Sequence, residues 1–129
     1  MVSKMARQSF TPSLERAGPA AVVCLIGELD LATAPRLAPT ADELRARPVT
    51  KLVLDLRQLS FLDAAGVAPL VELAVSLAES GCATVAVGAS PQQELILGMT
   101  PIALGRDADL DRERIDGRGP SAAEEDGAA

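Results

Sequence analysis

The stretch from Lys51 to Val67 constrains the fold of this chain more than any other part of the sequence. It opens with alternating polar and apolar residues, continues as an apolar run, and changes at Asp63 to the 3.6-residue period of a helix. Such a change is typical of a buried strand that leads into a helix. Open α/β sheets bind ligands and partners where strands end and helices begin. We therefore expect the Asp63–Gly66 turn to lie close to the functional site.

Length and charge exclude several classes of function. A chain of 129 residues predicts one domain with a real core, and its net charge is −6 at neutral pH. Phe10 and Phe61 are its only aromatic residues, and it has no basic cluster. Nucleic-acid surfaces need both positive charge and stacking side chains. We therefore expect no direct nucleic-acid partner.

The sequence contains no histidine and no glycine-rich phosphate loop. Histidine is the commonest general base and a frequent zinc ligand, and nucleotide sites of the common kinds need the loop. We expect no catalytic residues, no cofactor and no metal. A small hydrolase that uses the carboxylates of Glu28, Asp30 and Asp63 is kept as a poorly supported alternative.

No apolar run approaches the roughly 20 residues that a membrane span needs, and the first residues lack the apolar region of a signal peptide. We expect a cytoplasmic protein with no membrane partner. Cys24 and Cys82 each lie in an apolar, strand-like run. They are expected to be reduced core residues rather than a disulfide.

Composition divides the chain into three parts. Residues 1–8 are predicted to be a flexible leader and residues 9–105 the folded domain. Residues 106–129 hold eight acidic residues and four arginines, which predicts an acidic and largely disordered tail. One turn of helix near Asp109–Ile115 is left open.

Hydrophobic periodicity predicts an α/β fold with the order β-β-α-β-α-β-α-β. The expected strands cover about residues 9–15, 20–29, 50–57, 82–87 and 101–104, and the expected helices about 33–47, 63–80 and 91–98. Thr33 and Asp63 are the predicted N-caps of the first two helices. Strand–helix–strand units imply parallel strands, so we expect a mixed, mostly parallel sheet of 4–5 strands with 3–4 helices.

Three segments together carry a family resemblance. They are Ile26-Gly27-Glu28-Leu29-Asp30 with Thr33-Ala34, then Leu52-Val53-Leu54-Asp55-Leu56, and Phe61-Leu62-Asp63-Ala64-Ala65-Gly66-Val67. This combination resembles the STAS domain and, more narrowly, the bacterial anti-sigma factor antagonists. The resemblance extends from about Ser9 to Leu104 and implies a single STAS-like domain.

The resemblance implies a module that binds an anti-sigma factor, usually a serine kinase of the ATPase type, and so releases a sigma factor for transcription. In this family the kinase phosphorylates the residue directly after the turn aspartate. That position is Ala64 here, followed by Ala65, and neither has a hydroxyl group. Phosphorylation adds about −1.5 to −2 charges, which an alanine cannot receive. We therefore expect an antagonist that is not controlled by phosphorylation.

The resemblance implies partner-binding residues at the ends of the second and third expected strands. They are Glu28, Asp30, Thr33, Asp63, Ala64, Ala65, Gly66 and Val67. The residues alone also permit structural roles for some of them, because Asp63 suits an N-cap and Gly66 suits tight packing. Ser60 and Thr33 carry hydroxyl groups nearby but do not match the acceptor position.

Two further alternatives stay open. The chain would fit equally well as a STAS-type scaffold module of another assembly, such as one for lipid transport or stress signalling, where a phosphorylation site was never needed. The second alternative is that two copies of this chain form a weak homodimer.

Overall fold

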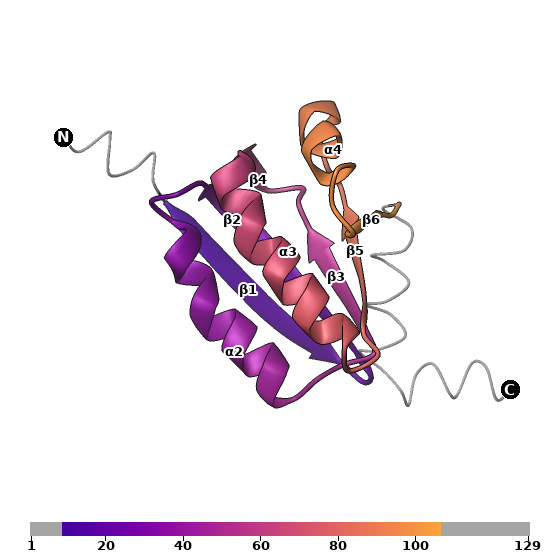
Figure 1. Ribbon diagram of the computed structural model, residues 1–129. Helices are drawn as coiled ribbons and strands as arrows, with labels where there is room; N and C mark the ends of the chain where they lie inside the picture. The colour runs from indigo at the N-terminus through magenta and orange to yellow at the C-terminus, as the bar shows by residue number, and fades with distance from the viewer. Residues whose placement is uncertain (1–8, 107–129) are drawn as a thin grey trace, which may run out of the picture.

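The computed structural model of this chain describes residues 9–106 (Figure 1). The leader at residues 1–8, the tail beyond Arg106 and the helical turn near Asp109–Ile115 lie outside the described residues, so these expectations stay predictions. The element boundaries are as follows. The strands are β1 Phe10–Ala17, β2 Ala20–Leu29, β3 Lys51–Asp55, β4 Leu59–Leu62, β5 Ala83–Val87 and β6 Ala103–Leu104; the helices are the 3-10 helix η1 Ala34–Leu37 and the α-helices α2 Ala38–Ala46, α3 Ala64–Ala78 and α4 Pro91–Leu97.

The strands form one six-stranded mixed sheet with the order β1-β2-β3-β5-β6, and β4 pairs with β2 beside this path. Only the β1–β2 pair is antiparallel among the pairs that the described residues form. This confirms the predicted α/β class and the mostly parallel sheet. The sheet has one strand more than the upper end of the expected 4–5, because residues 59–62 form a separate strand rather than a lead into the turn.

β2 is long enough to pair with two strands in succession. Its first half pairs with β3, from Ala20 opposite Lys51 to Cys24 opposite Asp55. Its last residues pair with β4, from Gly27 opposite Leu59 to Leu29 opposite Leu62, and the register shifts between Gly27 and Glu28. Gly27 has a φ of 108°, which favours glycine, and its N–H donates to the carbonyl of Gln58 (3.1 Å). β3 and β4 therefore both lie beside β2, and the irregularity falls within the β2–β4 pair.

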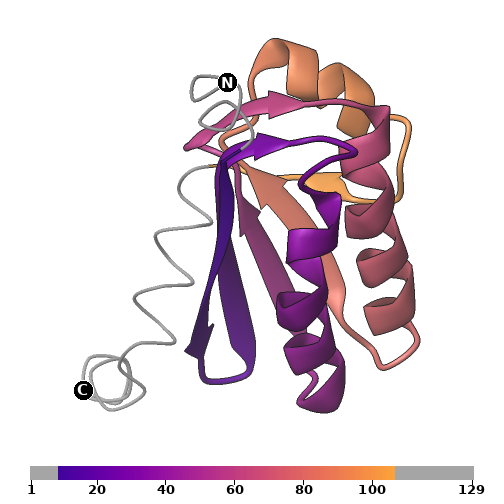
Figure 2. The same cartoon turned by 90° about the vertical axis from the view of Figure 1, so that its left-hand side faces the viewer.

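The helices α2 and α3 pack on one face of the sheet (Figure 2). Successive strand residues point to opposite faces, and the apolar residues on the helix side form the main core. Core side chains include Val23, Leu25, Leu52 and Leu54 from the sheet and Leu44, Leu70, Leu73 and Leu77 from the helices. Burial of these aliphatic side chains is the main stabilising contribution to such a fold.

Two local predictions differ from the structure. β1 extends to Ala17 rather than ending near Glu15, because the Gly18-Pro19 turn is short and Ala17 still pairs with Ala20. Thr33 was expected to cap the first helix, but its side chain makes no cap hydrogen bond to η1. Its hydroxyl bonds within the preceding loop instead, as described below.

Several other predictions are confirmed. Asp63 is the N-cap of α3, and Cys24 and Cys82 are both buried and free. Cys24 lies opposite Asp55 on β3, whereas Cys82 precedes the residue opposite Lys51 at the other end of that strand. The two thiols are therefore held apart by the sheet.

Candidate functional site

The end of β2 and the turn before α3 meet at one edge of the sheet. Glu28 lies opposite Phe61 and Leu29 opposite Leu62 in the parallel β2–β4 pair. Because the strands run in the same direction, the residues that follow them leave at the same edge. The structure thus brings the segment after Leu29 next to the segment after Leu62. The sequence indicated this proximity only indirectly, through the predicted α/β fold class.

Gly66 allows these two segments to touch. A Cβ at this position would overlap the carbonyl oxygen of Leu29. The first turn of α3 therefore packs directly against the backbone at the end of β2. The sequence left open whether Gly66 serves packing or a partner, and the contact shows a packing role.

Asp63 holds the beginning of α3. Its backbone is extended, and its Oδ1 accepts a hydrogen bond from the N–H of Gly66 (2.9 Å). The cap satisfies one of the N–H groups that a helix start leaves without a partner. Ala64, the first residue of α3, is exposed beside it.

Asp30 and Thr33 close the loop after β2 on itself. The Thr33 hydroxyl donates to the carbonyl of Glu28 (2.7 Å) and accepts from the N–H of Asp30 (3.0 Å). Oδ1 of Asp30 accepts from the N–H of Thr33 (3.0 Å). Thr33 is fully buried, so these bonds stay shielded from water and fix the shape of the loop.

The eight predicted site residues differ in how far a partner could reach them. Thr33, Gly66 and Val67 are buried, and any effect they have on binding would be indirect. Ala64 is exposed. Glu28, Asp30, Asp63 and Ala65 are half-buried.

The sequence analysis did not include Leu31 among the site residues, although Leu31 lies between the predicted site residues Asp30 and Thr33. Its side chain is 76% exposed, which is unusual for a leucine. It helps to line a groove of about 380 Å³ between the η1–α2 segment and α3. The groove is lined by Leu31, Ala34, Pro35, Leu37, Ala38, Ala41, Arg45, Ala68, Pro69 and Glu72. The available signal was an apolar residue, Leu31, in a loop whose flanking residues Asp30 and Thr33 hydrogen-bond to each other.

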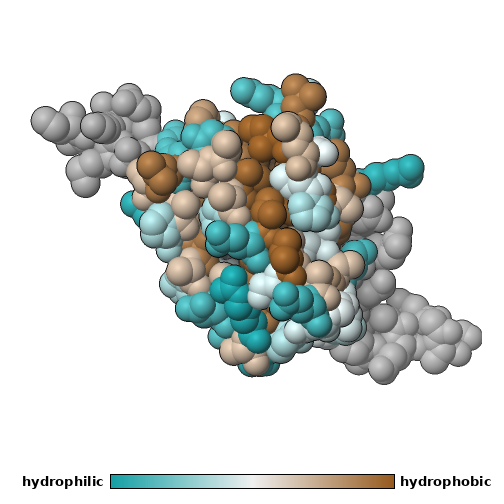
Figure 3. Space-filling view, in the orientation of Figure 1, coloured by the Kyte–Doolittle hydropathy of each residue, from teal (hydrophilic) through white to brown (hydrophobic). Residues whose placement is uncertain are grey.

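The outer side of α3 is also apolar. Glu72 is the only charged residue within the helix, and Val75 is 48% exposed. Figure 3 shows hydrophobic surface along this helix. The groove, Leu31 and Ala64 thus adjoin a helix that presents little charge. Surfaces of this kind are typical of protein–protein contact.

Gln93 is a second residue that the sequence analysis missed. It is buried, and it forms a capping box with Ser90 at the start of α4. Its Nε2 also donates to the carbonyl of Leu59 (3.0 Å). This bond ties α4 to β4, the strand that carries the chain to Asp63. A glutamine three residues after a serine was the available signal.

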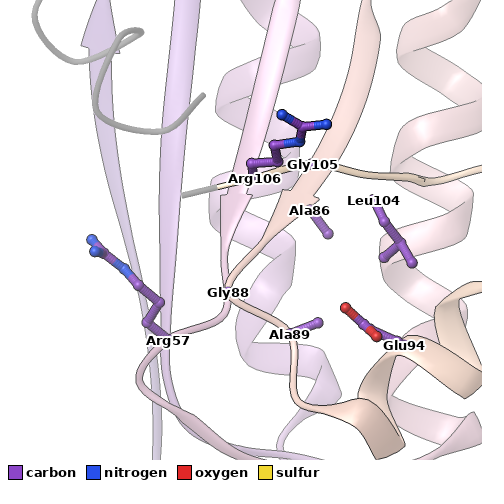
Figure 4. A pocket seen from close by; sticks show the side chains of 8 residues that line it. All are labelled: Arg57, Ala86, Gly88, Ala89, Glu94, Leu104, Gly105 and Arg106. Atoms are coloured by element: carbon purple, nitrogen blue, oxygen red, sulfur yellow. The ribbon is translucent and has the colours of Figure 1, made fainter. Parts of the chain in front are cut away.

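A separate pocket of about 410 Å³ lies at the carboxyl ends of β5 and β6 (Figure 4). Arg57 and Arg106 are among its lining residues. The Arg57 guanidinium, however, makes two hydrogen bonds of 3.1 Å to the buried carboxylate of Asp55. Figure 4 shows the Arg57 side chain directed away from Glu94 and Leu104. The pocket therefore does not present a converging set of charges to a ligand.

Within residues 9–106 no group of three potential metal ligands is found. Carboxylate oxygens of Asp30 and Asp63 are engaged by backbone N–H groups. In the same part of the chain, no helix is both long and apolar enough to span a membrane.

Solved structures resemble this fold closely. An anti-sigma factor antagonist from Mycobacterium paratuberculosis is 28% identical, with a TM-score of 0.64, over 84% of this chain and 97% of that chain. SpoIIAA, the cell fate determinant of Bacillus, matches in its phosphorylated form at 20% identity, with a TM-score of 0.65, over 79% of this chain and 98% of that chain. Its unphosphorylated form, described as an anti-sigma factor antagonist, matches at the same identity and TM-score over 84% and 99%.

A sequence comparison with curated proteins gives no match. A family model does match, and its description is "Mlab, STAS domain". The match covers residues 13–100, which include the end of β2, the Asp63 turn and all of α3. The chain therefore belongs to the STAS domain family.

Proposed function

We propose that this protein is an anti-sigma factor antagonist that binds its partner without control by phosphorylation at the α3 turn. The similar protein from Mycobacterium paratuberculosis is described as such an antagonist and is 28% identical over nearly its whole length. The proposed docking surface is the edge where the loop after β2 meets the start of α3. Glu28, Asp30, Asp63 and Ala64 lie there, and Leu31 and the adjoining groove extend it.

One observation carries the absence of phosphorylation control. The residue directly after the α3 cap is Ala64, which is exposed but has no oxygen that could accept a phosphoryl group. The following residue, Ala65, lacks one too. This part of the surface therefore keeps the same charge whatever kinase activity surrounds it. An interface that binds when uncharged would then stay competent at all times.

The neighbouring hydroxyl groups are poor substitutes as acceptors. Thr33 is fully buried and its hydroxyl already bonds to Glu28 and Asp30. Ser60 is exposed, but its Oγ donates to the carbonyl of Gly27 (3.0 Å) in the neighbouring strand. A kinase would have to open the loop after β2 to reach Thr33, and it would have to break the hydrogen bond to Gly27 to use Ser60.

The partner proposed for this surface is an anti-sigma factor of the ATPase or serine-kinase type. Affinity capture from the host with the full chain as bait tests this. We expect recovery of such a protein on the native bait and much less on the Ala64→Glu variant, which places a charge in the contact. Ala78→Glu is the matched control, because Ala78 is an exposed alanine at the other end of the same helix.

The description of the matching family model supports a second candidate function. That model is described by the STAS domain and not by antagonist activity, which favours retaining a scaffold role in another assembly, such as one for lipid transport or stress signalling. Recovery of transport or scaffold subunits, in equal amounts on the native and Ala64→Glu baits, would support this role and contradict the antagonist proposal.

A further inference from the structure

The strand β1 forms one edge of the sheet. Within residues 9–106, β1 pairs only with β2, and β2 lies between β1 and β3. Figure 2 shows the β1–β2 hairpin at one margin of the sheet. An edge strand directs the backbone N–H and C=O of every second residue away from the sheet. Such groups can add a strand from another chain, so the β1 edge is a surface on which a second chain could dock.

The register of the β1–β2 pair identifies the residues of β1 that face outward. Ala17 lies opposite Ala20 across the two-residue turn Gly18-Pro19, and the closing pair of such a hairpin is hydrogen-bonded. An even number of residues further along β2, the N–H of Glu28 donates to the carbonyl of Ser9 (2.9 Å), which gives the same alternation. Pairs between the hydrogen-bonded ones turn their N–H and C=O groups away from each other. The outward-facing residues of β1 are therefore Phe10, Pro12, Leu14 and Arg16.

Pro12 occupies the second of these outward positions. A proline has no N–H to donate, and its ring stands where the carbonyl of an added strand would approach. Because the position faces outward, the β1–β2 pair loses no hydrogen bond to it. We propose that Pro12 closes the β1 edge to strand addition, so that two copies of this chain do not pair through it.

A second copy is the partner that this edge would otherwise fit. Two copies of β1 related by a twofold axis pair antiparallel, and each contact then occurs twice. In the register that sets Phe10 opposite Arg16, Pro12 lies opposite Leu14 in both halves of the ladder. Each Leu14 carbonyl then lacks a donor from the opposite strand. Registers that avoid Pro12 use only the outward groups of Leu14 and Arg16, and such a ladder is shorter than ordinary strand pairs.

The other end of the strand order is limited in a different way. β6 consists of Ala103 and Leu104 alone, and Pro101 lies two residues before it. Very short edge strands offer few groups for pairing. The inference concerns pairing between copies, so it stands independently of the proposed function. For the homodimer alternative, it removes the route through β1.

Sedimentation velocity of the full chain and three variants tests the proposal. Pro12→Ala and Pro12→Val both restore an outward N–H, the first with a small side chain and the second with a β-branched one. Both should associate, with a dimer dissociation constant roughly tenfold or more below that of the native chain. Ser13→Val is the matched control, because it places a valine at the next residue, whose N–H already faces β2. It should stay as monomeric as the native chain.

Amide hydrogen exchange then locates the contact. In the native chain the outward N–H groups of Leu14 and Arg16 should exchange fast, whereas those of Thr11 and Ser13 should be protected by their bonds to β2. In the associated Pro12→Val variant, protection should extend to Leu14 and Arg16.

Three results would overturn the proposal. If Pro12→Ala and Pro12→Val stay as monomeric as the native chain, the missing N–H does not close the edge. If Ser13→Val associates to the same extent, an added apolar side chain explains the effect. If Leu14 and Arg16 are already protected in the native chain, the edge is occupied and not closed. Loss of that protection on dilution would identify a second copy as the occupant, and its persistence would identify another part of this chain.

Discussion

Gly66 in the first turn of α3 packs against the carbonyl oxygen of Leu29, the last residue of β2. This contact joins two segments that are 37 positions apart in the sequence, and it sets the distance between the loop after β2 and the Asp63 turn. The shape of the edge proposed to bind a partner therefore depends on this close contact between the two backbones.

Replacement of Gly66 by alanine should destabilise the fold. Its Cβ would overlap the Leu29 carbonyl oxygen, and backbone atoms cannot move aside as a flexible side chain would. We expect a loss of about 1–3 kcal/mol in the free energy of unfolding, measured by urea denaturation. Gly18→Ala is a useful comparison, because a Cβ there meets nothing within 4 Å. Its loss should be limited to the strain of its positive φ, about 1 kcal/mol. Equal losses at both positions would contradict the packing role of Gly66.

The Thr33 hydroxyl should matter more than its methyl group. Thr33→Val keeps the shape but leaves the Glu28 carbonyl and the Asp30 N–H without this partner, at a cost of about 1–3 kcal/mol. Thr33→Ser keeps the hydroxyl and should cost clearly less. Thermal or urea denaturation of the two variants measures the difference. If valine proves the better replacement, the hydrogen bonds do not stabilise the loop.

Asp63 combines a structural and a surface position, and two variants separate them. Asp63→Ala removes the acceptor for the N–H of Gly66, and its stability should fall by about 1 kcal/mol. Asp63→Asn retains a capping oxygen and should stay near native stability while losing the charge. Capture of the partner by the asparagine variant, at native stability, then reports on the carboxylate charge alone. A stability loss in Asp63→Asn equal to that in Asp63→Ala would contradict this division.

Ala64→Ser should restore a phosphate acceptor at the start of α3. The side chain at this position is exposed, so a serine hydroxyl would be reachable. Incubation with ATP and the kinase-type partner recovered by capture should add one phosphoryl group, seen by intact mass. The native chain should show no addition under the same conditions. Modification of the native chain, for example at Ser60, would contradict the proposed lack of phosphorylation control.

Cys82 predicts a loss of stability at high pH. Burial raises the pKa of its thiol above the ordinary value of 9.0, while hydrogen bonds from the Thr84 side chain and the Leu52 backbone oppose the rise. The unfolded chain then ionises first, so the stabilising contribution is complete below about pH 9 and falls as pH rises further.

Urea midpoints at pH 7.5 and pH 10 measure this effect. The chain has no tyrosine and two lysines, and its other ionisable groups, including the thiol of Cys24, are the same in both proteins. The native chain should lose stability between the two pH values, and Cys82→Ala should lose less. Identical pH dependence in both proteins would show that the thiol does not carry the effect.

The sequence alone determined the order of most elements, the α/β class and the family. Those features depend on local patterns: an apolar run for β2, a 3.6-residue period for α3, and an acidic residue before an apolar helix for the Asp63 cap. Family resemblance added the position of Ala64, where the absent hydroxyl could be read directly from the residue type.

Tertiary structure decided what the pattern could not express. Residues 59–62 form a strand only because the end of β2 offers them a partner. Thr33 looked like a helix cap in sequence, but the loop turned its hydroxyl toward Glu28 and Asp30. Exposure of Leu31 likewise depends on how the loop lies over the groove. Pairing, burial and exposure are relations between distant segments, so they follow from the packed chain and not from any one stretch of it.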